Sequence, residues 1–236
     1  MQAGERLILQ IEFKGENITD LKKLPVQGFS NENYIFTLEN TTYLLRKFKL
    51  WDRDRQREFD VQTLAYKKGL AAKPLLLDLE NDYMICEFLE GHHKEKLERA
   101  EISLMAQVLK TLHSLKIDHP LLDLKSEFSV LDESLKDAFE MIEKREKETV
   151  LCHNDLNPKN CIFSKEGLKL IDWEFAGMHD LYFDLASFSV EFQLSLLDEA
   201  YLLASYFGSK GWDKEKLDAY KIIYRALCTK WFNENT

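Results

Sequence analysis

Glycine and proline are scarce in this chain, which has nine of the first and four of the second among its 236 residues. That composition excludes a collagen-like repeat and a long Pro/Gly-rich disordered protein. Long apolar runs are missing too: no stretch approaches eighteen uncharged apolar residues, and residues 1–10 lack the basic start and apolar run of a signal peptide. We therefore expect a globular protein of the cytoplasm, without membrane insertion.

Cysteine is also sparse, and its spacing carries no pattern. The four cysteines are Cys86, Cys152, Cys161 and Cys228. They form no Cys-x-x-Cys motif and no Cys/His cluster that could hold zinc, and the neighbouring His92-His93 has no further ligands at metal-binding spacing. We expect small buried hydrophobic residues at these four positions, and no disulfide framework.

Positive charge is in the minority, with 32 Lys and Arg against 41 Asp and Glu, a net charge of -9. This balance argues against a surface that binds nucleic-acid phosphates. Hydrophobic residues make up 45% of the chain and charged residues 31%, as in ordinary globular proteins. A chain of this length predicts one domain or two closely joined lobes.

The residue pattern changes near residue 90. Before it, alternating apolar residues predict strands and one charged amphipathic stretch predicts a helix. The expected strands are 7–13, 34–38, 43–48, 75–79 and 83–88, and the expected helix is 52–69. After it, apolar residues at threes and fours predict helices over 97–117, 131–147, 184–207 and 213–232, with short strands at 161–163 and 168–171. The prediction is an α+β fold with an N-terminal lobe, 1–90, and a C-terminal lobe, 91–236.

One stretch has the residue types that phosphoryl transfer requires. It runs from Cys152 to Asn160 as Cys-His-Asn-Asp-Leu-Asn-Pro-Lys-Asn, and Leu-Ile-Asp-Trp-Glu follows at 170–174. Such a reaction needs a carboxylate to orient the attacking hydroxyl and oxygen ligands for Mg²⁺. Asp155, Asn160 and Asp172 can supply them. The alternative is a set of solvated loop residues, but then every position would match by accident.

These residues resemble the kinase-like phosphotransferases that include aminoglycoside phosphotransferases and choline and ethanolamine kinases. The shared pattern is H-x-D-x-x-x-x-N followed by I-D-x-E. It is matched here by His153, Asp155, Asn160, Asp172 and Glu174. The sequence is most similar to bacterial choline and ethanolamine kinases. No Asp-Phe-Gly triplet and no Ala-Pro-Glu segment follows, which disfavours a protein kinase.

The resemblance implies a two-lobed protein-kinase-like fold that binds ATP and Mg²⁺. It assigns Asp155 as the catalytic base, and Asn160 and Asp172 as the metal ligands. Asn157 would face the transferred phosphate. His153 would brace the loop, and Asp184 would support it through hydrogen bonds.

The resemblance also implies a nucleotide site in the N-terminal lobe. The stretch Gln27–Tyr34 resembles a phosphate-covering loop, with Ser30, Asn31 and Asn33 as contacts, although an ordinary hairpin turn fits the same letters. Arg46 takes the place of a phosphate-binding lysine, with Glu58 as its ion-pair partner, unless Glu58 is a surface residue of a charged helix. Lys47 would face solvent on the opposite side of the strand. Backbone groups from Glu87 to Leu89 would bind adenine, or simply end a buried strand.

The expected acceptor is a small-molecule alcohol, most simply choline or a related amino alcohol. An aromatic box attracts a quaternary ammonium, and Glu174 could add a carboxylate to it. The aromatic candidates are Trp173, Tyr182, Phe183, Trp212, Tyr224, Trp231 and Phe232, with Trp173, Tyr182 and Trp231 preferred. Choline kinases tend to carry two C-terminal tryptophans three apart, and this chain has only Trp231 there. An aminoglycoside, thiamine or another small alcohol is therefore an alternative acceptor, and a nucleotide-binding pseudoenzyme with a protein partner is an alternative of another class. The sequence does not determine the oligomeric state.

Overall fold

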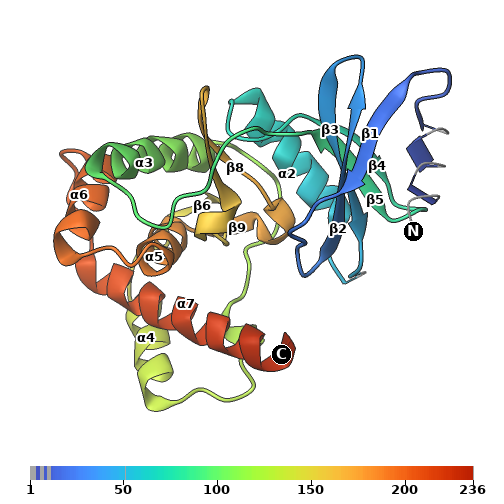
Figure 1. The fold of residues 1–236 in the computed structure, drawn as a ribbon. Coiled ribbons are helices and arrows are strands. Elements are labelled where there is room, and N and C mark those ends of the chain that lie inside the picture. The colour runs from blue at the N-terminus through green and yellow to red at the C-terminus, as the bar shows by residue number, and fades with distance from the viewer. Residues whose placement is uncertain (1–3, 6–7, 10–11, 51, 236) are drawn as a thin grey trace. The chain divides into compact units, whose positions relative to one another are not determined.

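The computed structural model describes residues 4–5, 8–9, 12–50 and 52–235. It divides into two compact units, Met1–Glu90 and Gly91–Thr236. The first unit is dominated by an antiparallel sheet and the second by helices (Figure 1). The predicted α+β class is therefore confirmed.

The first unit contains a five-stranded antiparallel sheet with the order β1-β2-β3-β5-β4 and the helix α2. The elements are β1 (Ile18–Lys23), β2 (Asn31–Leu38), β3 (Thr41–Phe48), α2 (Arg55–Lys67), β4 (Pro74–Asp78) and β5 (Tyr83–Glu87). Inward side chains of β2 alternate along the strand, and Tyr34 and Phe36 join a buried cluster with Leu9, Leu45 and Ile85.

The hairpin β2–β3 forms as predicted because its turn suits the strand twist. Leu38 pairs with Thr41, so Glu39 and Asn40 form a two-residue loop, and their φ angles are +47° and +69°. Positive φ at both positions matches the type I′ turn, whose twist agrees with that of the flanking strands. The helix α2 also agrees with the prediction. It ends where Gly69 takes a φ of +73°.

The strand predicted at 7–13 is wrong for the residues that the structure describes. Ile8, Leu9 and Glu12 are helical, and the Phe13 N–H donates to the Leu9 carbonyl at 2.9 Å, an i to i−4 bond. Leu9 and Phe13, four residues apart, both pack on the sheet's buried cluster. Residues 7, 10 and 11 lie outside the described part. The apolar residues of this segment fit both the two-residue period of a strand and the 3.6-residue period of a helix, and packing on the sheet selected the helix.

The second unit contains five α-helices and two small two-stranded antiparallel sheets within the described residues. The helices are α3 (Arg99–His113), α4 (Glu133–Glu143), α5 (Leu181–Glu191), α6 (Leu196–Phe207) and α7 (Lys214–Asn235). The paired strands are β6 (Thr149–Cys152) with β9 (Gly177–Asp180), and β7 (Cys161–Ser164) with β8 (Gly167–Leu170). Three 3₁₀ turns are η1 (Lys125–Glu127), η2 (Pro158–Asn160) and η3 (Trp173–Phe175).

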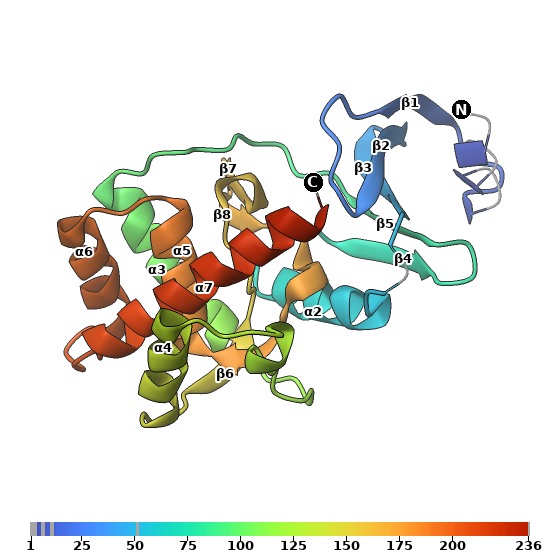
Figure 2. The same ribbon diagram turned by 90° about the horizontal axis from the view of Figure 1, so that it is seen from below.

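The helix α5 forms the centre of this unit, because its residues 181–189 are all buried. It packs against α7, which also packs along α4, and α3 packs against α6 (Figures 1 and 2). A helix that is apolar on every side is expected in such a position. Within the described residues no helix is long and apolar enough to cross a membrane.

Two predictions for this unit need correction. The helix predicted at 184–207 is two helices, α5 and α6, because the chain turns at Gln193 with a φ of +49° and Ser195 caps α6. The sheet β6–β9 was missed, since each strand is only four residues long and pairs with a distant segment. All four cysteines are free. Three are buried, and Cys228 is half-buried.

Candidate active site

The loop 153–160 joins β6 to β7, and the following hairpin returns the chain to it. Cys161 of β7 pairs with Leu170 of β8, and the next residues extend this contact, since the Ile171 N–H donates to the Asn160 carbonyl at 3.0 Å. Asp172 therefore emerges next to Asn160 although twelve positions separate them. Asp172 has a φ of +64°, a left-handed conformation that is strained for a side chain other than glycine.

Asp155 lies at the centre of an amide network. Asn157 Nδ2 donates to Asp155 Oδ1 at 3.0 Å, and Asn160 Nδ2 donates to Asp155 Oδ2 at 2.7 Å. Burial raises the pKa of Asp155 to about 6, and the negative charges of Asp172 and Glu191 act in the same direction, while the bonds from Asn157 and Asn160 oppose the rise. A carboxylate with this pKa is mostly ionised at neutral pH and still basic enough to accept a proton.

Asn157 also organises the loop itself. Its Oδ1 accepts hydrogen bonds from the backbone N–H groups of Lys159 and Asn160, at 2.9 and 3.2 Å, and so caps η2. Both ends of its amide are engaged within the loop. The expected contact of Asn157 with a phosphate stays a prediction.

The oxygen atoms of Asn160 and Asp172 fit a magnesium site. Asn160 Nδ2 donates to two oxygens of Asp155, the backbone carbonyl at 3.0 Å and Oδ2 at 2.7 Å. This fixes the amide orientation, and Asn160 Oδ1 receives no hydrogen bond from the part of the chain that the structure describes. An amide oxygen beside a carboxylate is the hard-oxygen donor set that Mg²⁺ prefers, with phosphate and water completing its shell.

His153 holds the loop against the β8 end. Its Nε2 donates to the Ile171 carbonyl at 3.0 Å, and its ring lies 4.7 Å from that of Trp173. Burial lowers the pKa of His153, so the ring is neutral at physiological pH. These contacts support the predicted bracing role.

Asp184, on α5, is hydrogen-bonded to the backbone of the same loop. It accepts the N–H groups of His153 at 2.9 Å and Asn154 at 2.8 Å, and His113 Nε2 lies 3.1 Å away. Although burial alone would raise it, the hydrogen bond and charge of His113, then the loop contacts, leave the pKa of Asp184 below its usual value. A buried carboxylate with this many donors is satisfied as the anion.

His113 and Tyr206 belong to no motif, and they complete the set of contacts that anchors the loop to Asp184. The Tyr206 hydroxyl lies 2.7 Å from His113 Nδ1, so both ring nitrogens are engaged. Cys152 is close enough to His113 and Asp184 to suggest a metal cluster. Burial, however, raises the pKa of its thiol well above 9.0, and neither ring nitrogen is available as a ligand. The group is a hydrogen-bonded anchor.

In the first unit, Arg46 and Glu58 form a buried ion pair with Nη1 to Oε1 at 2.6 Å. The alternative of Glu58 as a surface residue is therefore wrong. Lys47 differs from its prediction: it is half-buried and pairs with Glu5 at 3.0 Å instead of facing solvent alone. Strand alternation placed it correctly on the opposite face from Arg46.

The expected phosphate loop is held by one side chain. Gln27 Oε1 accepts the Asn33 N–H at 2.7 Å, and its Nε2 donates to the carbonyls of Leu24 and Asn33. Ser30 and Asn31 are buried beside it. The loop is thus fixed within the unit, and its role toward phosphate stays a prediction.

The segment after β5 offers fewer free donors than expected. The Glu87 N–H donates to the Lys73 carbonyl at 2.9 Å, and the Phe88 N–H donates to the Thr42 carbonyl at 3.0 Å. Both are used inside the first unit. Over the described ranges the Leu89 N–H makes no such bond, so it is the donor that remains for an adenine ring.

The family model described as "Phosphotransferase enzyme family" matches residues 21–220. The chain belongs to this family. The match includes the loop 153–160, Asp172 and Asp184, the residues that the structure brings together.

Relatives of this phosphotransferase include LicA proteins and choline and ethanolamine kinases. Protein LicA of Haemophilus influenzae strain Rd is 27% identical over 234 residues, with 87% of this chain and 86% of the relative covered. The crystal structure of choline kinase LicA from Streptococcus pneumoniae has a TM-score of 0.80 at 25% identity, covering 98% and 91% of the two chains. An ethanolamine kinase of Plasmodium vivax shares the fold with a TM-score of 0.75 at 18% identity, covering 97% and 80%. The predicted kinase-like fold is confirmed, and the protein is a small-molecule phosphotransferase of choline kinase-like type.

Of the predicted acceptor residues of the phosphotransferase, Trp173, Glu174 and Tyr182 are buried and Trp231 is half-buried. Tyr182 is buried, its hydroxyl accepts the Asp213 N–H at 2.7 Å, and Lys216 Nζ lies 4.6 Å from its ring centre. It is a core residue, and its assignment to the acceptor is wrong in this structure. Trp173 is buried against His153, and Glu174 is buried as well. Trp231, on α7, is half-buried and has an edge contact with Phe232.

The sequence did not single out Glu191. This residue ends α5, and its negative charge contributes to the raised pKa of Asp155. The Tyr224 hydroxyl, from α7, donates to Glu191 Oε1 at 2.9 Å. Neither residue belongs to a motif. They meet because α5 packs against α7.

Proposed function

We propose that this phosphotransferase is an ATP- and Mg²⁺-dependent kinase that phosphorylates the hydroxyl of choline or a related amino alcohol. The observation that supports this best is the Asp155 network: a carboxylate with a pKa of about 6, held by two amides beside the oxygens of Asn160 and Asp172. Phosphoryl transfer needs this combination of an orienting base and hard-oxygen ligands.

Each group then has one task. Asp155 accepts a hydrogen bond from the acceptor hydroxyl and orients it. It takes the proton as the acceptor oxygen bonds to the γ-phosphorus of ATP and the bond from that phosphorus to the ADP oxygen breaks, which releases ADP. Asn160 Oδ1 and the Asp172 carboxylate hold Mg²⁺, which when bound neutralises the charge on the phosphate oxygens. Asp184 and His153 keep the loop in place through the bonds described above, so that Asp155 needs no rearrangement during the reaction.

The first unit supplies the nucleotide contacts in this proposal. Arg46 binds a phosphate oxygen while Glu58 fixes its orientation. Ser30 and two residues at the start of β2, Asn31 and Asn33, cover the phosphates, and the Leu89 N–H donates to adenine. A solved LicA complex contains AMP and shares the fold, with a TM-score of 0.77 at 24% identity.

Glu191 is the residue that favours a cationic acceptor. Its negative charge acts on Asp155, and an ammonium or quaternary ammonium group is attracted to such a charge and to aromatic faces. Tyr224 orients Glu191, and Trp231 lies on the same helix as Tyr224, seven residues on. Seven residues span about two helical turns, which places the Trp231 ring on the same side of α7 as Tyr224.

An acceptor panel tests this function. ADP release would be measured with choline, ethanolamine, thiamine and an aminoglycoside, with Mg²⁺ and with EDTA. We expect choline or ethanolamine to be used, a requirement for Mg²⁺, and loss of turnover in Asp155→Asn, while Asp137→Asn, an exposed change on α4, keeps wild-type turnover. Glu191→Gln should raise KM for the cationic acceptor and leave KM for ATP unchanged.

Preference for an uncharged alcohol would refute the amino-alcohol acceptor and leave the kinase reaction standing. Near-normal turnover of Asp155→Asn with the best acceptor would refute the base. ATP binding without turnover on any acceptor would favour the alternative, a pseudoenzyme that acts through a protein partner.

A further inference from the structure

Glu58 binds two arginines, and only one of them belongs to the expected phosphate site. Arg46 Nη1 is 2.6 Å from Glu58 Oε1, and Arg55 Nη1 is 2.7 Å from Glu58 Oε2. All three side chains are buried, with 7% or less of each exposed. We call Arg46, Glu58 and Arg55 the arginine–carboxylate triad.

The sequence builds this triad from two short-range rules. Arg46 and Phe48 are two apart on β3 and so lie on the same face of the strand. Arg55 and Glu58 are three apart in the first turn of α2, where the helix dipole favours a carboxylate. Asp54 caps this turn by accepting the Arg57 N–H at 2.9 Å.

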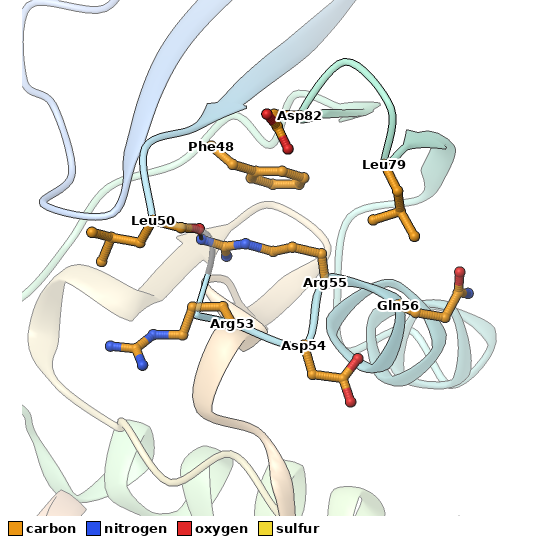
Figure 3. A pocket seen from close by; sticks show the side chains of 8 residues that line it. All are labelled: Phe48, Leu50, Arg53, Asp54, Arg55, Gln56, Leu79 and Asp82. Carbon is orange, nitrogen blue, oxygen red and sulfur yellow. Dashed lines mark hydrogen bonds between the residues drawn. The ribbon is translucent and has the colours of Figure 1, made fainter.

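Arg55 is fixed on a second side by an aromatic ring. Its Cζ lies 4.3 Å from the centre of the Phe48 ring, and its Nη2 is 3.4 Å from the Leu50 carbonyl. Figure 3 shows the guanidinium extended beneath the Phe48 ring in the wall of a cavity of about 300 Å³. A guanidinium stacked in this way and bound to a carboxylate has lost most of its freedom, so it holds Glu58 in one position.

Glu58 uses one carboxylate oxygen for each arginine: Oε1 faces Arg46 Nη1 and Oε2 faces Arg55 Nη1. Because Arg55 holds Oε2, the carboxylate presents Oε1 to Arg46 in one orientation.

The triad also reaches the predicted phosphate loop. The side-chain amide of Asn31 directs its oxygen to Arg46 Nη2 at 2.7 Å and its nitrogen to the Ser30 carbonyl at 3.0 Å. A continuous chain of contacts therefore runs from Arg55 through Glu58 and Arg46 to Asn31. Each link is a charge-assisted hydrogen bond, the stronger kind.

We infer that Arg55 is a positioning residue for nucleotide binding: it shares Glu58 with Arg46 and fixes the carboxylate, so that Arg46 is held in one orientation for the polyphosphate of a nucleotide. This inference rests on the proposed function, because it takes ATP as the ligand of Arg46. It assigns Arg55 no contact with ATP and no part in the chemical step.

The test compares three variants for ATP affinity in the presence of Mg²⁺, by calorimetry, and for kcat and KM. Arg55→Met keeps the apolar stem and removes the guanidinium that holds Glu58, so ATP should bind about tenfold more weakly, with kcat reduced by no more than about threefold. Arg55→Lys keeps the charge and should restore most of the affinity. Arg57→Met removes an equal charge from the same helical turn without touching Glu58, and should bind ATP like the wild type.

The outcomes separate this inference from the function on which it rests. Unchanged ATP affinity in folded Arg55→Met overturns the inference alone. If Arg55→Met does not fold, Arg55→Lys decides: near-wild-type affinity supports the inference, and a tenfold loss in a protein with wild-type circular dichroism overturns it. An equal loss in Arg57→Met overturns it as well, because general charge would then explain the effect. A wild-type protein that does not bind ATP with Mg²⁺ overturns the proposed function and this inference together.

Discussion

Replacing Asp155 by asparagine should remove catalysis and shift stability in favour of the variant as the pH rises toward neutral. Burial raises the pKa of Asp155 from 3.8 to about 6, so the native state holds a proton that the unfolded chain releases. The stability that this group contributes is fully present below pH 3.8 and is lost as the pH rises through about 6. Asparagine carries no proton to lose, so its stability does not follow this curve.

The size of the effect comes from the same values. A pKa difference of about 2 units corresponds to about 3 kcal/mol in the free energy of unfolding, at about 1.4 kcal/mol per unit. Partial exposure of Asp155 reduces this toward about 1.5 kcal/mol, because solvent screens the charge. A constant offset is also expected, because two amide N–H groups donate to the carboxylate and asparagine has only one side-chain oxygen.

The assay is chemical denaturation without metal at several pH values between about 3.5 and about 7.5, for wild type and Asp155→Asn. The contributions of all other titrating groups cancel when the unfolding free energy of one protein is subtracted from that of the other. It should move in favour of the variant by about 1.5–3 kcal/mol across this range. Asp137→Asn, on the exposed side of α4, should show a flat difference. A flat curve for Asp155→Asn too, or one that moves in favour of the wild type as pH rises, would refute the reasoning about burial.

Three further changes should have distinct outcomes. Asp172→Ala should lose the Mg²⁺-dependent part of ATP affinity, and equal affinities with and without metal in both proteins would contradict its role as a ligand. Gly91→Ala should destabilise the protein by about 2 kcal/mol or more, because the new Cβ would lie 2.5 Å from Ile162 Cγ2 and 2.7 Å from the Phe163 carbonyl oxygen. Gly211→Ala is the control, because a Cβ there has no neighbour within 4 Å. Equal melting temperatures for the two variants would refute the clash. Tyr206→Phe should lower the free energy of unfolding, measured by urea denaturation, by about 1–2 kcal/mol and should lower kcat, because the buried His113 Nδ1 loses its hydrogen-bond partner. An unchanged free energy of unfolding would show that this hydrogen bond does not stabilise the anchor.

Local rules explain why much of the fold was predictable. The hairpin at Glu39-Asn40 has turn residues that tolerate positive φ, and α2 has a cap at Asp54 and a stop at Gly69. The segment 7–13 shows where such rules fail. Its apolar residues fit two periods, and contacts with a sheet formed much later in the chain decided between them.

The site divides in the same way. Asp155, Asn160 and Asp172 were identifiable because their chemistry requires particular side chains at particular spacings along one loop and hairpin. Glu191 was not, and neither were the roles of Tyr224 and Tyr182. Whether an aromatic residue on a helix faces a ligand or the core depends on which helix covers it, and sequence periodicity does not contain that information.

The class of reaction, the catalytic loop and most of the helices and strands follow from the chain's residues alone, because these features depend on local chemistry and on residue period. The folded protein was needed to show that Asp184 holds the catalytic loop with His113, that Tyr182 is a core residue, and that Arg55 shares Glu58 with Arg46. Each of these features depends on packing between elements that are distant in the chain. Packing determines which side chains are buried, and burial determines how strongly a charge or a hydrogen bond acts.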